Sequence, residues 1–152
     1  MGGSVAATGR GTAKRAPTDE SLLTVARLVM DVSVRAADDV GGLSPVQLRA
    51  LTALRRNSGA NLAQLAEEMG VTVSTASRLV DRLVAADWVH RRPSASNRRE
   101  ISLSLSSAGK DVLRRYDDRR VGRLHECLDQ VAPDRREAVI EALRELVHVV
   151  RP

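Results

Sequence analysis

Two short segments with helical periodicity are separated by only Gly70 and the residues leading to Thr72. The first segment begins at Asn61, which forms the pattern of a capping box with Gln64. The second begins after Thr72, a residue type whose hydroxyl group caps helices well. Two helices joined through so short a turn are typical of a helix-turn-helix. This pair therefore constrains the fold more than any other feature of the chain.

The hydrophobic period changes directly after the second of these helices. Residues 88–90 favour a strand, residues 93–97 are rich in turn formers, and residues 101–105 alternate apolar and polar side chains. A β-hairpin that follows a helix-turn-helix is called a wing. We therefore predict a winged helix-turn-helix DNA-binding domain over residues 43–106.

Long segments with helical periodicity flank this domain. Thr18 is expected to cap the first of them, and Gly41 and Gly42 end it. Ser106 or Ser107 is expected to cap the long segment that follows the hairpin, and a break that contains proline opens a last helix. The predicted fold class is mainly α with a small β-hairpin wing.

The flanking helices have apolar faces that are too wide for a small helix-turn-helix to cover. Pairing of two copies would bury them, so residues 18–42 and 107–152 are predicted to form a helical dimerisation region. A closed monomeric bundle is the alternative. Residues 1–17 are small, polar and basic, and we expect a disordered basic tail there.

A further helix is predicted from Pro45, with Ser44 as its cap and Gln47 completing a capping box. The side chains expected to face inward are Val46, Ala50, Leu51 and Leu54 on this helix and Ala76, Leu79, Val80, Leu83 and Val84 on the helix after Thr72.

The helix after Thr72 carries small polar and basic side chains that the core does not need. Ser and Thr bond phosphates and base edges, and Arg binds guanine in a bidentate way. The alternative is that the hydroxyl groups only cap the helix, while Arg78 and Arg82 pair with Asp81 and with Glu67 or Glu68. The predicted DNA-contacting residues of this recognition helix are Val73, Ser74, Thr75, Ser77, Arg78 and Arg82.

The predicted hairpin is strongly basic. Its four arginines are Arg91, Arg92, Arg98 and Arg99, against one acid at Glu100. A basic hairpin beside a recognition helix can lie along the DNA backbone or place an arginine in the minor groove. The alternative is a solvated basic loop. The net charge of +5 also agrees with a polyanionic partner, although such a charge serves solubility as well.

The order of these elements resembles the MarR family of bacterial regulators. The motifs that carry the resemblance are LSPVQLRAL at 43–51, LAQLA at 62–66, VTVSTASRLVDRL at 71–83, WV at 88–89 and LSLSSAG at 103–109. The resemblance implies an obligate homodimer built from the first and the last two helices. It also implies a palindromic operator in double-stranded DNA, and often a small ligand bound between the dimerisation and DNA-binding regions.

The hairpin tip departs from the family pattern, which commonly reads Asp-x-Arg followed by Asp-Arg-Arg. Here Ser94 and Ser96 replace the first Asp and the Arg, and the second motif reads NRR at 97–99. The resemblance therefore implies phosphate contact by Arg98 and Arg99, and it leaves minor-groove insertion open.

The expected function is sequence-specific regulation of transcription by a repressor that a small apolar ligand releases. Leu22, Val29 and Leu51 are the predicted pocket residues, although core packing explains them equally well. The alternatives are a regulator that binds DNA constitutively without an effector and a winged-helix module that binds another protein.

The sequence offers no catalytic or metal-binding motif, so we expect neither an enzyme nor a cofactor. His90, His125 and His148 are far apart and lack the helical spacing of a metal site. Cys127 is the single cysteine, which excludes an internal disulfide; it is expected to be an inert interface residue, with oxidant sensing as the alternative. No apolar stretch of the length of a membrane span or of a secretory signal is present, so the expected location is the cytoplasm, in association with the nucleoid.

Overall fold

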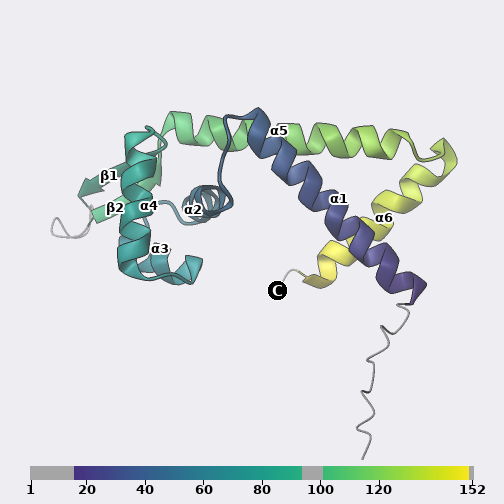
Figure 1. Ribbon diagram of the computed structural model, residues 1–152, viewed down its shortest axis with the longest axis horizontal. Coiled ribbons are helices and arrows are strands. Elements are labelled where there is room, and N and C mark those ends of the chain that lie inside the picture. Colours follow the sequence, from purple (N-terminus) through teal and green to yellow (C-terminus); the bar gives the residue numbers. More distant parts are fainter. Residues whose placement is uncertain (1–15, 94–100, 151–152) are drawn as a thin grey trace, which may run out of the picture. The chain divides into compact units, whose positions relative to one another are not determined.

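The computed structural model describes residues 16–93 and 101–150 (Figure 1). These residues form two compact units, one up to Asp31 and one from Val32 onward. The mainly α fold with a β-hairpin before a long helix confirms the predicted fold class. In chain order the elements are α1 (Pro17–Asp39), α2 (Pro45–Arg56), α3 (Leu62–Met69), α4 (Val73–Ala85), β1 (Val89–Pro93), β2 (Ile101–Leu105), α5 (Ser107–Asp129) and α6 (Pro133–Val150).

The first unit consists of the early turns of α1. This helix begins at Pro17, so Thr18 lies inside it, and the prediction that Thr18 is the cap was wrong. Proline suits the first helical position because the N–H that it lacks would have no partner there. Asp19 and Glu20 follow in the first turn, where the helix dipole favours negative charge.

The predicted starts of α2, α3 and α4 are confirmed in detail. The Ser44 hydroxyl accepts a hydrogen bond from the Gln47 backbone N–H, and the Gln47 side chain accepts one from the Ser44 N–H. Asn61 and Gln64 form the same reciprocal pair at the start of α3. Thr72 caps α4. These local signals fix where α2, α3 and α4 begin.

The turn between α3 and α4 depends on Gly70. This residue has a φ of 63°, in the left-handed region that glycine adopts without a Cβ penalty. The Gly70 N–H donates to the carbonyl group of Glu67, and the Val71 N–H donates to that of Ala66. These bonds close the end of α3, so that α4 begins at Val73.

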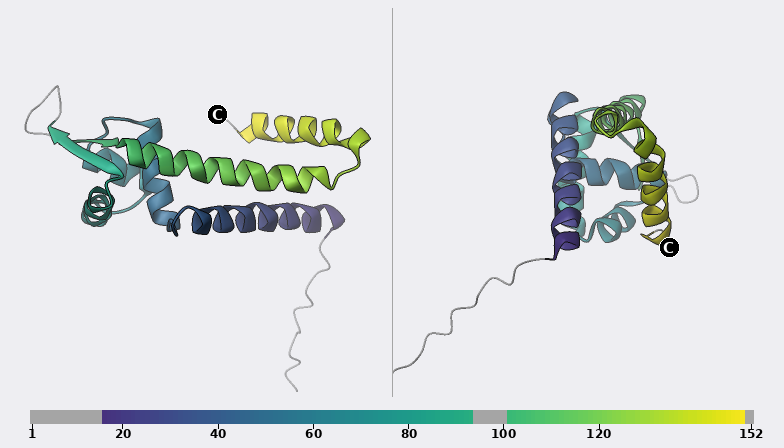
Figure 2. Two further views of the ribbon diagram at one scale, coloured as in Figure 1. Left: turned by 90° about the horizontal axis from the view of Figure 1, so that it is seen from above. Right: turned by 90° about the vertical axis from the view of Figure 1, so that its right-hand side faces the viewer.

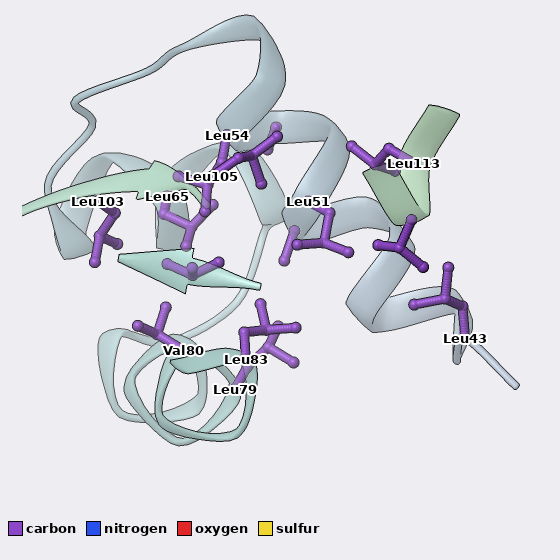
Figure 3. Packing of buried hydrophobic residues seen from close by; sticks show 14 of the residues in the cluster. Leu43, Leu51, Leu54, Leu65, Leu79, Val80, Leu83, Leu103, Leu105 and Leu113 are labelled. Carbon is purple, nitrogen blue, oxygen red and sulfur yellow. The ribbon is translucent and has the colours of Figure 1, made fainter. Parts of the chain in front are cut away.

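The hydrophobic core of the second unit joins α2, α3, α4, the hairpin and the start of α5 (Figure 3). Burying one leucine side chain contributes about 2 kcal/mol, so this cluster holds α4 firmly beside the hairpin. One leucine from each of the five elements is at most 1% exposed: Leu51, Leu65, Leu83, Leu103 and Leu113.

Two side chains that were expected to face inward do not. Val46 is 41% exposed and Val84 is 40% exposed. Val46 lies in the first turn of α2 and Val84 in the last turn of α4, where a helix has fewer neighbours. Helical spacing locates the apolar stripe but does not show that packing stops near a helix end.

The hairpin is attached to the rest of the unit along β2. β1 and β2 are antiparallel, with Arg91 opposite Leu103. On the other edge of β2, the Gly59 N–H donates to the Leu103 carbonyl and the Leu103 N–H donates to the Ala60 carbonyl. Backbone hydrogen bonds from the loop between α2 and α3 therefore support the strand that β1 pairs with.

The first turn of α5 is closely packed against the start of β1. The buried Ser106 hydroxyl accepts from the Gly109 N–H and donates to the Asp87 carbonyl at 2.5 Å. The Ser106 N–H donates to the Trp88 carbonyl at 3.0 Å. Ser106 is thus the cap of α5; it is one of the two serines, Ser106 and Ser107, that were predicted as candidates for that role. From this joint α5 continues as one helix, and α6 turns back from its end (Figure 2).

Ser106→Ala is expected to lower the free energy of unfolding by about 2 kcal/mol. The substitution removes the cap and leaves the Asp87 carbonyl without this donor. Urea unfolding followed by circular dichroism measures the change. Ser107→Ala is the matched control because Ser107 is exposed, and its effect should stay within about 0.5 kcal/mol. Equal losses from the two variants would contradict the capping role.

Candidate nucleic-acid interface

An exposed stripe runs along α4 on the side away from the core. Ser74, Arg78 and Arg82 are each four residues apart and all exposed. Residues four apart lie on one face of a helix, whereas the buried face of α4 contains residues such as Ala76 and Val80. We call Ser74, Arg78 and Arg82 the α4 stripe. It presents one hydroxyl group and two guanidinium groups side by side.

The hydroxyl groups at the start of α4 are linked to the capping residue. Thr72 Oγ1 lies 3.0 Å from Ser74 Oγ and 2.9 Å from Thr75 Oγ1. A hydroxyl group has one donor and two acceptor positions, so Ser74 and Thr75 keep capacity for a further hydrogen bond. Val73 beside them is 49% exposed and Ser77 is half-buried. The first turn of α4 thus holds exposed polar groups in a fixed arrangement.

Ion pairs distinguish the arginines near α4. Asp81 pairs with Arg91 at 3.1 Å, and Glu68 pairs with an arginine of α2 at 3.0 Å. Within the described residues, Arg78 and Arg82 take part in no ion pair. Asp81 and Glu68 therefore do not neutralise Arg78 and Arg82 in the structure, in contrast to the alternative considered from the sequence. Their positive charge remains available.

The structure places two of the four predicted hairpin arginines. Arg91 and Arg92 lie on β1, and both are exposed. Neighbouring side chains of a strand point to opposite faces, so these two arginines have different surroundings. Arg98 and Arg99 lie outside the described residues.

The arginines of α2 make contacts that sequence reasoning missed. Arg49 donates to the Met69 carbonyl at 2.8 Å, and Arg55 pairs with Asp117 of α5 at 2.6 Å. Arg56 is the partner of Glu68. These contacts join α2 to α3 and α5, so they support the position of the helix-turn-helix. Their partners are too distant in sequence for a local pattern to reveal them.

The three predicted pocket residues have different surroundings. Leu51 is 0% exposed and belongs to the core of the second unit. Leu22 and Val29 lie in the unit up to Asp31, with exposed fractions of 58% and 40%. Core packing thus explains Leu51, and the ligand pocket stays a prediction.

An apolar surface extends over the second half of α5 and over α6. No side chain from Pro133 to Val149 is buried. An open depression of about 420 Å³ lies along one face of α6, beside Leu143 and Val147. Large exposed apolar patches mark interaction surfaces in soluble proteins. We call this the α5–α6 surface; its exposed apolar residues are Val121, Leu124, Val139, Leu143, Leu146, Val147 and Val149.

The remaining candidate residues do not come together. His90 lies on β1, His125 on α5 and His148 on α6. Across residues 16–93 and 101–150, no cluster of three or more His, Cys, Asp or Glu side chains could hold a metal ion. Cys127 is free and half-buried on α5. In the same part of the chain, no helix has the length and apolar character to cross a bilayer.

This chain is similar to known proteins both in sequence and in structure. The model of the MarR family matches residues 43–101, which span α2 to the start of β2. The crystal structure of RV1404 from Mycobacterium tuberculosis is similar with a TM-score of 0.78 and 32% sequence identity. That similarity covers 91% of this chain and 97% of RV1404.

Two proteins of Bacillus subtilis (strain 168) are similar in sequence. The uncharacterized HTH-type transcriptional regulator YfiV is 28% identical over 101 residues, which are 66% of this chain and 63% of YfiV. The HTH-type transcriptional repressor MdtR is 32% identical over 68 residues, which are 45% of this chain and 44% of MdtR. The match therefore spans less than two thirds of either relative.

Proposed function

Since the chain belongs to the MarR family, we propose that it regulates transcription by binding double-stranded DNA in a sequence-specific way. The observation that carries the proposal is the α4 stripe, whose two arginines take part in no ion pair among the described residues. The names of YfiV and MdtR as transcriptional regulators support it. Members of this family regulate transcription, and we propose that this chain has no enzymatic activity.

In this proposal α4 is the recognition helix and lies in the major groove, which is wide enough for an α-helix. Arg78 and Arg82 contact guanine edges or phosphates, and Ser74 contacts the backbone close to the helix start. The hairpin lies along the neighbouring phosphates, with Arg92, Arg98 and Arg99 as its cations. The core holds α4 and the hairpin together, so both elements meet the DNA as one body.

We further propose that two copies pair through the α5–α6 surface, together with the other helices of the dimerisation region. A twofold dimer presents two α4 helices to successive major grooves, about 34 Å apart, and reads a palindromic operator. The exposed apolar side chains of α6 support this, because a single copy leaves them between 37% and 84% exposed.

The regulator is proposed to be a cytoplasmic repressor that a small apolar ligand releases from the nucleoid. The name of MdtR as a repressor supports the sign of regulation. A ligand can release the dimer from the operator only if it binds the arrangement of the dimer that does not fit DNA better than the one that does. A thermal-shift screen tests this, since a true effector raises the melting temperature and weakens operator binding. A constitutive regulator would show neither effect with any compound.

The first experiment is fluorescence anisotropy with a duplex from upstream of the protein's own gene. A scrambled duplex is the control, and both are titrated at two salt concentrations. We expect tight binding to the native duplex, a large margin over the scrambled one and a steep loss of affinity with salt. Salt-insensitive or absent binding to both duplexes would contradict the proposal and favour a protein-interaction module.

Arg78→Gln is expected to weaken operator binding about 10- to 100-fold and to reduce the margin over scrambled DNA. The expected loss follows from the removal of a bidentate donor from the centre of the α4 stripe. Anisotropy titrations measure it. Arg115→Gln is the matched control, because it removes the same charge from an exposed position on α5. A comparable loss in the control would show that net charge, and not contact by α4, causes the effect.

A further inference from the structure

An ion pair joins the hairpin to the recognition helix. Arg91 Nη1 of β1 lies 3.1 Å from Asp81 Oδ1 of α4. The Arg91 side chain is 34% exposed and that of Asp81 is 58% exposed. Arg91 pairs in register with Leu103, whose side chain is 0% exposed and faces the core. Residues in register share a face of the sheet, so Arg91 points to the side on which α4 packs.

The neighbouring Arg92 is exposed as Arg91 is, but it lacks the ion pair and the register with a buried leucine. Strand alternation places Arg92 on the opposite face, where its register partner is Ser102. Arg92 is exposed and takes part in no ion pair within the described residues. Two adjacent arginines of one strand therefore differ: Arg91 pairs with Asp81, whereas Arg92 has no ion-pair partner among residues 16–93 and 101–150.

We propose that Arg91 does not contact DNA and that, with Asp81, it is a positioning pair that sets the hairpin relative to α4. This inference rests on the proposed function, because position matters only if α4 and the hairpin bind one duplex together. A phosphate group that took Arg91 from Asp81 would leave the carboxylate next to the negative DNA backbone. The internal pair avoids that repulsion and keeps Arg91 out of the set of phosphate contacts.

Salt dependence distinguishes a DNA contact from a positioning pair. Each cation that neutralises a phosphate adds nearly one unit to the slope of log K against log salt concentration. The double variant Asp81→Asn/Arg91→Gln removes the pair without a change in net charge. We expect it to keep the wild-type slope while operator affinity falls about 3-fold, the size of effect expected for a surface ion pair. Arg92→Gln, which removes one charge from the same strand, is expected to lower the slope by about 1. A fall of about 1 in the double variant would overturn the proposal.

Hydrogen exchange of the free protein tests the pair without DNA. The β1 and β2 amides of Asp81→Asn/Arg91→Gln should exchange about 3-fold faster than those of the wild type. The swapped variant Asp81→Arg/Arg91→Asp restores opposite charges and should restore slow exchange. Unchanged exchange in the first variant, or no rescue by the swap, would overturn the positioning role. If the wild type itself bound no duplex, the proposed function would fail, and the exchange result would still decide on the pair.

Discussion

Gly109→Ala is expected to destabilise the second unit by about 3 kcal/mol, the upper end of the usual cost of overpacking. A Cβ atom on Gly109 would lie 2.0 Å from the Trp88 carbonyl oxygen and 2.9 Å from its carbonyl carbon. Both are backbone atoms, so no side chain can move aside. The first turn of α5 would have to separate from the start of β1, which would break the Ser106 contacts there.

Gly122→Ala is the matched control for this prediction. It is the same substitution in the same helix, but a Cβ atom at Gly122 meets nothing within 4 Å. Alanine favours a helix over glycine, so this variant should gain about 0.8 kcal/mol. Chemical denaturation of the two variants should thus give changes of opposite sign. A stabilised Gly109→Ala protein would show that α5 does not approach Trp88 this closely.

Leu143→Glu is expected to raise the dissociation constant of the dimer about 100-fold. Leu143 is 50% exposed in one copy and lies in the middle of the α5–α6 surface. Pairing would bury the new carboxylate among apolar side chains, and buried anchors of this kind cost about 2–4 kcal/mol when lost. Operator binding should weaken as well, because a monomer reaches only one half-site.

Sedimentation equilibrium at micromolar concentration measures this effect. Ala138→Glu is the matched control, since it adds the same charge to α6 at an exposed position on the side away from Leu143. The control should remain dimeric. A wild-type protein that sediments as a monomer would contradict the dimer proposal, and a dimeric Leu143→Glu protein would place the interface elsewhere.

The predictable part of the fold is the part that neighbouring residues decide. The capping boxes at Ser44 and Asn61 and the turn at Gly70 each need only a few consecutive residues, and the structure has them as predicted. The hairpin was predicted from the change from helical periodicity to alternating apolar and polar residues. The exposure of Val46 and Val84 did not follow, because it depends on what lies beyond the end of a helix.

In the candidate site, too, a local sequence pattern predicts some features and only the tertiary structure shows the others. Helical spacing places Ser74, Arg78 and Arg82 on one exposed face, and this needs no knowledge of other elements. The pairing of Asp81 with Arg91 needs the angle between α4 and β1, which no local pattern contains. The sequence therefore suggested Asp81 as a possible partner of Arg78 and Arg82, whereas in the structure Asp81 pairs with Arg91 of the hairpin.

The joint between Ser106 and the start of β1 turns α5 into a lever. The helix has 23 residues, and at 1.5 Å per residue it is about 35 Å long. A rotation of about 5° at the joint moves its far end by about 3 Å, as simple geometry on that length requires. Conversely, a displacement of about 3 Å at the far end corresponds to a rotation of the whole helix by only about 5°. Because α4 and the hairpin share one core with the start of α5, they rotate with the helix as one rigid body.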